Sequence, residues 1–533
     1  MKQTSILILA VVPVLFSCKK SFLDVNQNPN QPTVVTPNVV LSAALAGSAN
    51  NVGTDFLKVN NLMGYWSRSG SYVPDAQTEQ YNIPNDYTDA DWANVYNTLN
   101  SYDYIEKQGH ANNTPFYIGV AKTMKAVHFS TLVDIYNDVP YSDAFKPQTS
   151  IQPKYDKGQD IYTDLVKQLD SAVYFFDLAK TQYTSAGFPG STLVTDDKYD
   201  IMFGRGKGGS STGAAKTRMD KWVAFANTVK LKLLVHQSKT ADPGYITTEI
   251  ASITTNGRGF LGAGQQASIN PGYTLSTNQL SPFVGNFQTA TGGPSNNAAY
   301  FRANNYALGF YSSTGDERQL SFYVPLTGTT VAGNYEGDPQ SASNTFTSAV
   351  GGGFGGTIKS PSQDQLILSD FESLFIQAEA TERGWLPGGN PVARNLDSLA
   401  IQQNFVYLDP NGDPTGAADR ADAATYLSGA GLLAAPSSTT YLDWGAASDK
   451  IQFIITQKWA ALNGINWVEA WTDFRRTGFP TSDVLSISHA ATHVQNKIPV
   501  RYLYPQTELN TNSANVPPLS TPDLFNTPPF WAK

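Results

Sequence analysis

Residues 222–233 read WVAFANTVKLKL, and the spacing of their apolar side chains decides the fold class. On a helix with about 3.6 residues per turn, one face carries Trp222, Phe225, Ala226, Val229 and Leu233. Apolar residues that recur at this spacing predict an amphipathic helix with one face in a core. Such stripes belong to a core more often than to a ligand site, so this stretch indicates a scaffold.

The same helical period recurs elsewhere in the chain. Shared faces are formed by Tyr117, Val120, Met124 and Val127, by Phe371, Leu374, Phe375 and Ala378, and by Ile451, Ile455, Trp459 and Leu462. Further helices are predicted near residues 38–52, 89–108, 158–180, 392–406 and 465–475. The sequence therefore predicts a mainly α fold with helical pairs like those of tetratricopeptide repeats, although no period of about 34 residues is visible.

Three long segments between these helices have a different composition. They are residues 183–217, 262–364 and 407–444, and they are rich in Gly, Ser, Thr and Asn. In the second segment aromatic residues are interleaved, and short strands are expected around residues 300–311 and 320–325. Long loops inside a compact domain are usually functional. We therefore expect one large domain, residues 18–533, in which helices form the scaffold and loops form a working face.

The first residues have the pattern of a lipoprotein signal. An apolar stretch, residues 6–16, is too short to span a bilayer and ends shortly before Cys18. Cys18 is the only cysteine, so the monomer can form no internal disulfide and no cysteine-based metal site. We expect residues 1–17 to be cleaved, Cys18 to be acylated, and residues 18–37 to tether the domain to a membrane that the chain does not span.

The charge balance argues against nucleic acid as a partner. The chain carries a net charge of −8, and 15% of its 533 residues are charged. Nucleic-acid binding rewards clustered Lys and Arg, and no such cluster is present. Because Asn, Thr, Ser, Gln, Gly and Tyr take the place of charges, neutral polar ligands fit this composition best.

Motifs for metal or cofactor chemistry are incomplete. His489 and His493 have a spacing that can hold zinc, but position 490, where the metalloprotease motif has its catalytic Glu, is Ala. Residues 204–209 read GRGKGG, and they match neither the dinucleotide fingerprint nor the phosphate-binding loop in the required context. The sequence therefore predicts neither a metal nor a cofactor.

Glu372, Glu379 and Glu382 lie on one predicted helix and raise the alternative of a hydrolase. Glycoside hydrolysis needs two carboxyl groups about 5–9.5 Å apart. Acids at helical spacing are more often solvated or paired, here with Arg383 as a candidate partner. No carboxyl group is marked as desolvated, so we predict no catalytic residue and favour a binding protein over an enzyme.

Aromatic residues are the more informative set, with 9 Trp, 27 Tyr and 27 Phe. A sugar ring has a weakly polar C–H face that stacks on Trp or Tyr, and burying such a ring contributes about 1.5–3 kcal/mol. Arg and Asn side chains can bind the hydroxyl rim. For any one residue, simple anchoring of a loop is the commoner role. The predicted ligand-binding residues are Tyr65, Trp66, Arg68 and Tyr72, with Tyr300 and Arg302 behind them.

Several stretches resemble the SusD/RagB family of Bacteroidota lipoproteins, and more closely its second large SusD-like subfamily. After Cys18, residues 22–24 read FLD and residues 28–32 read NPNQP, as is common in that family. Residues 469–480 read EAWTDFRRTGFP and are similar to the family's Trp-x-Asp-x-Arg-Arg-Thr-Gly-x-Pro block. The IPVR of residues 498–501 follows in family order, so the resemblance runs from Cys18 to the end of the chain.

This resemblance implies properties that composition alone does not. Family members have a mostly helical fold with tetratricopeptide-like pairs and an irregular, loop-rich part. They form a lid over a TonB-dependent, SusC-like outer-membrane transporter and capture oligosaccharides, or in some members peptides, without cleaving them. A lipid-anchored protein of the outer membrane, expected at the cell surface, is therefore predicted. Within the shared block, Asp473 is expected to pair with Arg475 or Arg476 and to pin the C-terminal segment.

Three alternatives to a glycan-capturing lid stay open. A peptide-capturing homologue shares every structural expectation. A lipoprotein glycoside hydrolase would release reducing ends. A purely structural interaction protein would bind the transporter and ignore soluble nutrients.

Overall fold

The structure is a computed structural model, and it describes residues 35–146, 149–204, 211–339, 342–351, 356–433, 436–481 and 497–532. Residues 1–36 form one unit and residues 37–533 form a second, compact unit, and the description below concerns the second. The predicted signal peptide, Cys18, the pair His489 and His493, and most of the GRGKGG stretch lie outside the described residues.

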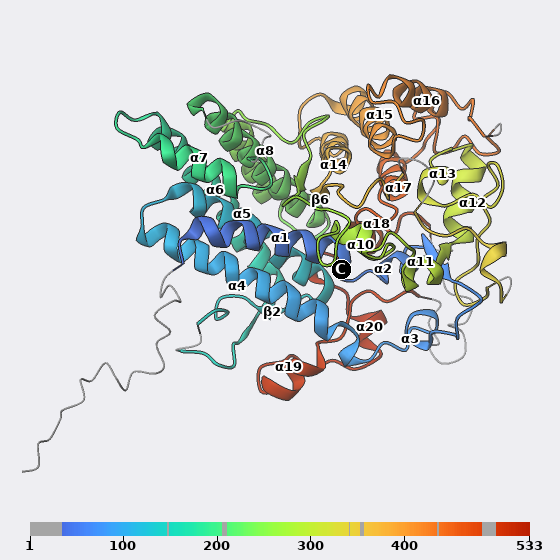
Figure 1. Cartoon of the computed structure of the whole chain (residues 1–533), viewed down its shortest axis with the longest axis horizontal. Coiled ribbons are helices and arrows are strands. Elements are labelled where there is room, and N and C mark those ends of the chain that lie inside the picture. Colours follow the sequence, from blue (N-terminus) through green and yellow to red (C-terminus); the bar gives the residue numbers. More distant parts are fainter. Residues whose placement is uncertain are drawn as a thin grey trace, which may run out of the picture. The chain divides into compact units, whose positions relative to one another are not determined.

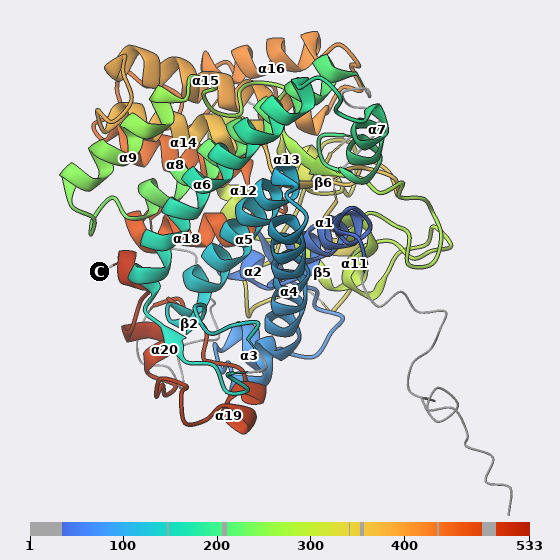
Figure 2. The ribbon, with the colours of Figure 1, turned by 90° about the vertical axis from the view of Figure 1, so that its left-hand side faces the viewer.

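One layer of long helices comes from the N-terminal half of the chain (Figure 1). Its members are α1 (Pro37–Thr54), α4 (Asp89–Ala111), α5 (Pro115–Tyr136), α6 (Gly158–Thr184) and α8 (Thr212–His236). Helices that follow one another pack together, α4 on α5 and α5 on α6, while α1 packs on α4 and α8 on α6. Figure 2 shows α4, α5 and α6 side by side. The predicted mainly helical fold with packed helical pairs is confirmed.

A second group of helices comes from the C-terminal half. It contains α14 (Asp370–Glu382), α15 (Gly389–Leu408), α16 (Ala417–Leu427), α17 (Lys450–Ala461) and α18 (Trp467–Thr477). Helix α14 packs on α15, α17 and α8, and α18 contacts α5 and α8, so the two groups share one core. The residues of the predicted stripe, Trp222 to Leu233, are buried in that core as expected. None of the described helices combines the length and apolarity needed to cross a membrane.

Local chemistry explains where these helices begin and end. Ser369 precedes α14, and its side chain accepts a hydrogen bond from the Glu372 backbone N–H at 3.0 Å. Asn466 caps α18 by accepting from the Glu469 N–H at 3.2 Å. Gly478 ends α18 with φ at 85°, a left-handed conformation that glycine adopts without a steric penalty.

Three short antiparallel strand pairs tie the loops to the helices. β1 (Trp66–Arg68) pairs with β5 (Phe301–Ala303), β2 (Val139–Pro140) with β3 (Tyr155–Asp156), and β4 (Ala267–Ile269) with β6 (Gln365–Leu368). The remaining helices are α2 (Val59–Leu62), α3 (Ala76–Glu79), α7 (Gly190–Tyr199), α9 (Pro243–Thr255), α10 (Pro282–Gly285), α11 (Asn296–Tyr300), α12 (Asn305–Thr314), α13 (Gln319–Phe322), α19 (Gln506–Thr511), α20 (Asp523–Asn526) and the 3-10 turns Asn85–Thr88, Asn344–Phe346 and Phe530–Ala532.

Parts of the three predicted loop segments are helical. The first contains α7 and the start of α8, and the third contains α16. The strand expected within residues 300–311 is present as β5 but ends at Ala303, where α12 follows. The strand expected at residues 320–325 is wrong, since residues 320–322 belong to α13 and Tyr323 makes only an isolated β-bridge with Val350. These short helices were not predicted because a helix that buries few residues shows little of the regular apolar spacing that indicates a helix.

Candidate functional site

The pairing of β1 with β5 brings the predicted ligand-binding residues together. Ser67 lies opposite Arg302, and Arg68 lies opposite Phe301. Two loops that are more than 200 residues apart in the sequence thus meet at this ribbon. The group so assembled is Tyr65, Trp66, Arg68, Tyr72, Tyr300 and Arg302.

Tyr65 and Trp66 are fully buried. The Tyr65 ring stacks on Trp459 with centroids 5.2 Å apart, and its hydroxyl donates to the Trp459 carbonyl oxygen at 2.6 Å. The Trp66 ring packs against Phe301 at 4.9 Å and against Phe287 at 5.5 Å. In this structure neither ring has a free face for a sugar, so both serve to anchor the loop to the core.

Arg68 and Arg302 are also buried, and they hold loop backbone. Arg68 pairs with the buried carboxylate of Glu79 and donates to the Tyr72 carbonyl oxygen. Arg302 donates to the carbonyl oxygens of Ala298 and Phe301, each at 2.8 Å. Both arginines therefore act on the shape of the loops that present Tyr72 and Tyr300.

Tyr72 and Tyr300 are the two predicted residues that reach the surface. Their ring centroids lie 5.2 Å apart with an interplanar angle of 73°, an edge-to-face contact. The Tyr72 hydroxyl donates to the Asn296 carbonyl oxygen at 3.4 Å, and the Tyr300 hydroxyl donates to Asp75 Oδ2 at 3.2 Å. Each ring is thus fixed at its polar tip while part of its carbon frame stays exposed.

Lys58 and Asp75 complete this contact, although the sequence pattern gave no sign of either residue. Lys58 Nζ lies 4.0 Å from the centroid of the Tyr300 ring and 3.1 Å from Asp75 Oδ2. Burial would raise the pKa of Asp75, but Lys58 and the Thr78 hydrogen bonds outweigh it and lower that pKa. The carboxylate therefore stays ionised beside the tyrosine pair.

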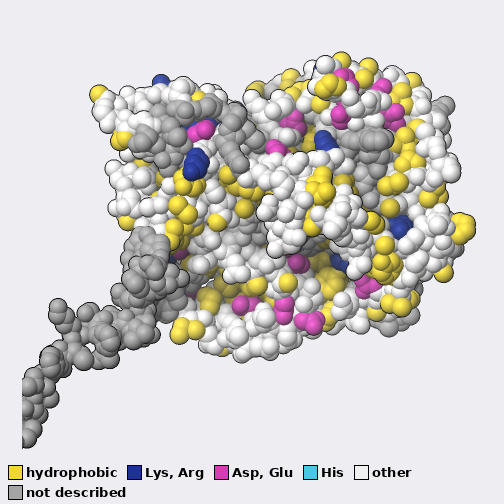
Figure 3. Space-filling model, viewed as in Figure 1, with side chains coloured by type: hydrophobic (Ala, Val, Ile, Leu, Met, Phe, Trp, Pro, Cys, Tyr) yellow, Lys and Arg dark blue, Asp and Glu magenta, His cyan; other side chains and the backbone are white. Residues whose placement is uncertain are grey.

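Two more exposed aromatic rings lie on an adjoining segment. Tyr335 is 55% exposed and Phe346 is 59% exposed. The segment that carries them is bonded to the Tyr72 loop, because Ser71 Oγ donates to the Ala342 carbonyl oxygen at 2.7 Å. We call Tyr72, Tyr300, Tyr335 and Phe346 the aromatic patch. Figure 3 shows hydrophobic side chains gathered at the surface over α11, on this side of the molecule.

One open recess is lined by Lys58, which covers the Tyr300 ring of the aromatic patch, and a second recess lies next to the first. The first, of about 470 Å³, is lined by Lys58, Gln77, Tyr87 and Asp91 among others. The second, of about 840 Å³, lies between the C-terminal end of α1 and residues 271–290. Thr54 lines both recesses, so they are neighbours.

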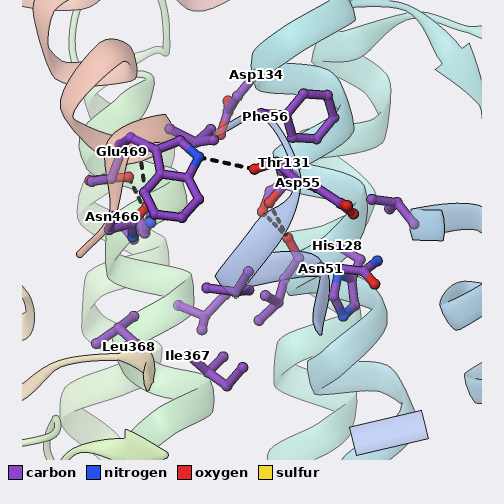
Figure 4. Close-up of a pocket in the computed structure, with 18 of the residues that line it drawn as sticks. Asn51, Asp55, Phe56, His128, Thr131, Asp134, Ile367, Leu368, Asn466 and Glu469 are labelled. Carbon is purple, nitrogen blue, oxygen red and sulfur yellow. Dashed lines mark hydrogen bonds and ion pairs between the residues drawn. The ribbon is translucent and has the colours of Figure 1, made fainter. Parts of the chain in front are cut away.

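A separate cavity of about 70 Å³ lies inside the molecule between α1, α5, α8 and α18 (Figure 4). Burial, with a smaller effect of Asp91, raises the pKa of Asp55 to about 8, and Asp55 Oδ2 has no hydrogen-bond partner among the described residues. Across the cavity Glu469 contacts Lys232 at 2.6 Å and His236 at 3.2 Å. A cavity of this volume suits a few water molecules and is too small for a sugar.

The three glutamates that raised the hydrolase alternative, Glu372, Glu379 and Glu382, each have different partners in the structure. Glu379 is buried between Arg476 and Arg383, which outweigh burial and hold its pKa at about 2. Glu372 pairs with Lys232 at 3.0 Å, whereas Glu382 accepts a hydrogen bond from Asn390 at 3.0 Å near the surface. An acid held ionised by two arginines cannot donate a proton to a leaving group at neutral pH.

Asp473 pairs with one of the two arginines, as predicted, but that pair binds Glu379 on α14, and it is Arg475 that contacts the C-terminal segment. Asp473 pairs with Arg476 at 2.6 Å. Arg475 instead lies 3.7 Å from the centroid of the Trp471 ring and donates to the Val500 carbonyl oxygen at 3.1 Å. Trp471 Nε1 donates to the Pro499 carbonyl oxygen at 3.0 Å, so two residues of the block bond neighbouring carbonyl oxygens of the segment.

The loops thus present an aromatic surface on a helical scaffold. The sequence profile of the SusD-like family, described as starch-binding and associating with the outer membrane, matches residues 29–505. The chain therefore belongs to the SusD-like family, in its second branch, and the resemblance seen in the sequence is confirmed.

Solved structures of SusD homologues share this fold. A chitin-binding SusD homologue from Flavobacterium johnsoniae has a TM-score of 0.70 at 19% identity, over 92% of this chain and 98% of that one. A SusD homologue from Bacteroides fragilis has a TM-score of 0.68 at 18% identity, over 94% and 100%. A protein of the SusD/RagB family from Bacteroides thetaiotaomicron has a TM-score of 0.66 at 18% identity, over 94% and 99%. Among curated proteins, no match is found.

Proposed function

We propose that this chain captures oligosaccharides at the aromatic patch and delivers them to a SusC-like, TonB-dependent transporter. The observation that carries the proposal is the Tyr72–Tyr300 contact, in which two fixed rings at the surface adjoin Lys58 and Asp75. Partly exposed rings with ordered polar neighbours match the two faces of a sugar, since carbon stacks on the ring and hydroxyls meet the charged and amide groups.

The family supports a nutrient of this class. Its description names starch, and two of the structural relatives carry chitin-binding in their names. Such relatives, at 19% and 22% identity, share the fold and leave the particular glycan of this chain open.

The location of the protein is part of the proposal. We infer that Cys18 carries the lipid anchor, that residues 18–37 form a tether, and that the domain stands at the cell surface as a lid over its transporter. A globomycin-treated culture, in which lipoprotein signal cleavage is blocked, tests the anchor, because the full-length precursor then accumulates. Cys18→Ser is expected to give a product that no longer incorporates labelled palmitate.

Glycoside hydrolysis is the second candidate, because of one carboxyl group near the patch. Burial raises the pKa of Glu336 to about 8, while Asp75 is kept ionised by Lys58. Carboxyl groups whose environments drive their pKa values apart are typical of glycosidases. Glu336 is 4% exposed, however, so a glycosidic oxygen has little access to it, and binding without cleavage is the favoured function.

The test is a calorimetric titration of residues 21–533, made without the lipid, against soluble oligosaccharides and peptides. Saturable heat with one glycan class that falls at least about 10-fold in affinity in Tyr72→Ala and Tyr300→Ala supports the site. Tyr174→Ala is the matched control, since Tyr174 is 63% exposed on α6 and lines none of the recesses described. Saturation by peptides alone would favour the peptide-capturing alternative, and release of reducing ends would favour the hydrolase.

Binding of the transporter without any soluble nutrient would favour the purely structural alternative. Co-purification of the lipidated chain with its transporter, compared with and without the glycan, distinguishes a glycan-capturing lid from a purely structural protein.

A further inference from the structure

The larger recess has a lining without charge. It has a volume of about 840 Å³ and lies between the end of α1 and residues 271–290. Among the described residues that line it there is no Asp, Glu, Lys, Arg or His. Amide and hydroxyl side chains take their place, chiefly Asn50, Thr54, Gln279, Asn286, Gln288 and Thr289.

This chemistry selects neutral polar ligands. Amides and hydroxyls donate and accept hydrogen bonds, as the hydroxyl groups of a sugar do. A charged peptide terminus or phosphate would lose its hydration here without gaining an ionic partner, which is unfavourable. The volume falls within the range of about 300–1,000 Å³ that is usual for small-molecule sites.

The wall of the recess contains polar atoms that lack partners. Ser281 Oγ and Gln288 Oε1 accept or donate no hydrogen bond among the described residues, and Ser281 is fully buried. Leaving such a group unpaired costs about 1–3 kcal/mol. Both atoms are shielded in this structure, so a ligand recovers part of that cost only where a small shift of the recess wall exposes them.

The recess is linked to the aromatic patch through Thr54 and Lys58. Thr54 separates it from the smaller recess, which Lys58 lines, and Lys58 covers the Tyr300 ring. On the other side, Ser295 Oγ bonds to the Asn286 carbonyl oxygen, and the chain then leads into α11, which ends at Tyr300. A molecule held at the patch can therefore extend along the protein toward the recess.

We propose that the charge-free recess is a second binding site for neutral oligosaccharide, which takes the distal units of a chain whose other end lies on the aromatic patch. The inference rests on the proposed function for the identity of the ligand, but it assigns a separate site. It requires that affinity depend on the length of the oligosaccharide, because short ligands cover the patch alone.

Asn50→Arg tests the site, since Asn50 is exposed on α1 and an arginine there places bulk and charge in the recess. Asn97→Arg is the matched control, because Asn97 is an exposed asparagine on α4 that lines none of the recesses described. The ligands are chito- and malto-oligosaccharides of two and six units, measured by calorimetry, after both variants have been shown to melt like the native chain.

The expected result for Asn50→Arg is a loss of about 10-fold in affinity for the six-unit ligand and no change for the two-unit ligand. Equal affinity of native chain and variant for both lengths would overturn the second site while the patch, tested by Tyr72→Ala, still stands. Six-unit binding that survives Tyr72→Ala and is lost in Asn50→Arg would keep the recess and remove the patch. Failure of every neutral oligosaccharide to bind the native chain would overturn both.

Discussion

Arg476 and Glu379 form a bidentate ion pair across 97 residues of sequence, with Nη1 to Oε1 at 2.6 Å and Nη2 to Oε2 at 2.5 Å. Both side chains are buried, and the pair joins α18 to α14. Charge-assisted, two-point contacts of this kind need the planar guanidinium that only arginine supplies. The Arg-Arg block and the Glu-rich helix of the sequence are therefore two halves of one structural contact.

Removing the arginine should destabilise the fold strongly. Arg476→Ala leaves the Glu379 carboxylate buried without its main partner, at an expected cost of about 3–5 kcal/mol in the free energy of unfolding. Urea unfolding followed by circular dichroism measures this change. Arg394→Ala, at an exposed position on α15, serves as the control and should shift the midpoint little. An Arg476→Ala midpoint equal to that of the native chain would contradict the role of the pair.

Asp473 should contribute to the same network. It contacts Arg476 at 2.6 Å and Lys458 at 2.9 Å, and its side chain is 3% exposed. Asp473→Ala leaves two buried cations short of a counter-charge, so the melting temperature should fall by several degrees. Asp160→Ala, at an exposed position on α6, is the control. If both variants melt with the native chain, Asp473 does not stabilise the buried network around Arg476 and Lys458.

The long helices could be predicted from the sequence because the apolar periodicity that indicates a helix lies within the helix itself. The stretch predicted at residues 89–108 is α4 (Asp89–Ala111), and that at residues 158–180 is α6 (Gly158–Thr184). In both, the apolar period of about 3.6 residues survives over many turns. The short helix α16 was missed because Ala and Asp dominate it and few of its side chains enter the core.

Only part of the candidate site could be predicted from the sequence. Tyr72 and Tyr300, both named from the sequence, do contact each other, but the burial of Tyr65 and Trp66 follows from their contacts with Trp459 and Phe301. Those contacts join residues that are hundreds of positions apart, and no local pattern encodes them. Asp75 and Lys58 carried no signal either, because a single surface ion pair has no characteristic spacing.

Lys58 should strengthen glycan binding by orienting Tyr300. Lys58→Met keeps the length of the side chain but removes the cation over the ring and the partner of Asp75. Such contacts contribute about 0.5–1 kcal/mol at exposed sites, so affinity should fall about 2- to 5-fold. Lys198→Met is a matched control, because Lys198 lies over the Tyr199 ring at 5.4 Å on α7. Equal losses in both variants would show that the effect is not specific to the patch.

The carboxyl group of Glu336 should make stability depend on pH in an unusual direction. Burial raises its pKa from 4.5 to about 8, so the folded chain holds a proton that the unfolded chain releases at neutral pH. The free energy of unfolding should therefore decrease as pH rises from about 5 to about 8, which is opposite to the effect of a salt-bridged acid such as Glu379. Glu336→Gln cannot ionise, so it should lose this part of the pH dependence. Its stability relative to the native chain should therefore be greater at pH 8 than at pH 5.

Asp338→Asn, which changes an exposed acid two positions away, provides the control for surface charge. The measurement is the urea midpoint of all three proteins at pH 5, 6.5 and 8. If the midpoints of the native chain and Glu336→Gln change with pH in parallel, Glu336 is ionised in the folded state. Its environment would then supply a positive partner strong enough to offset burial.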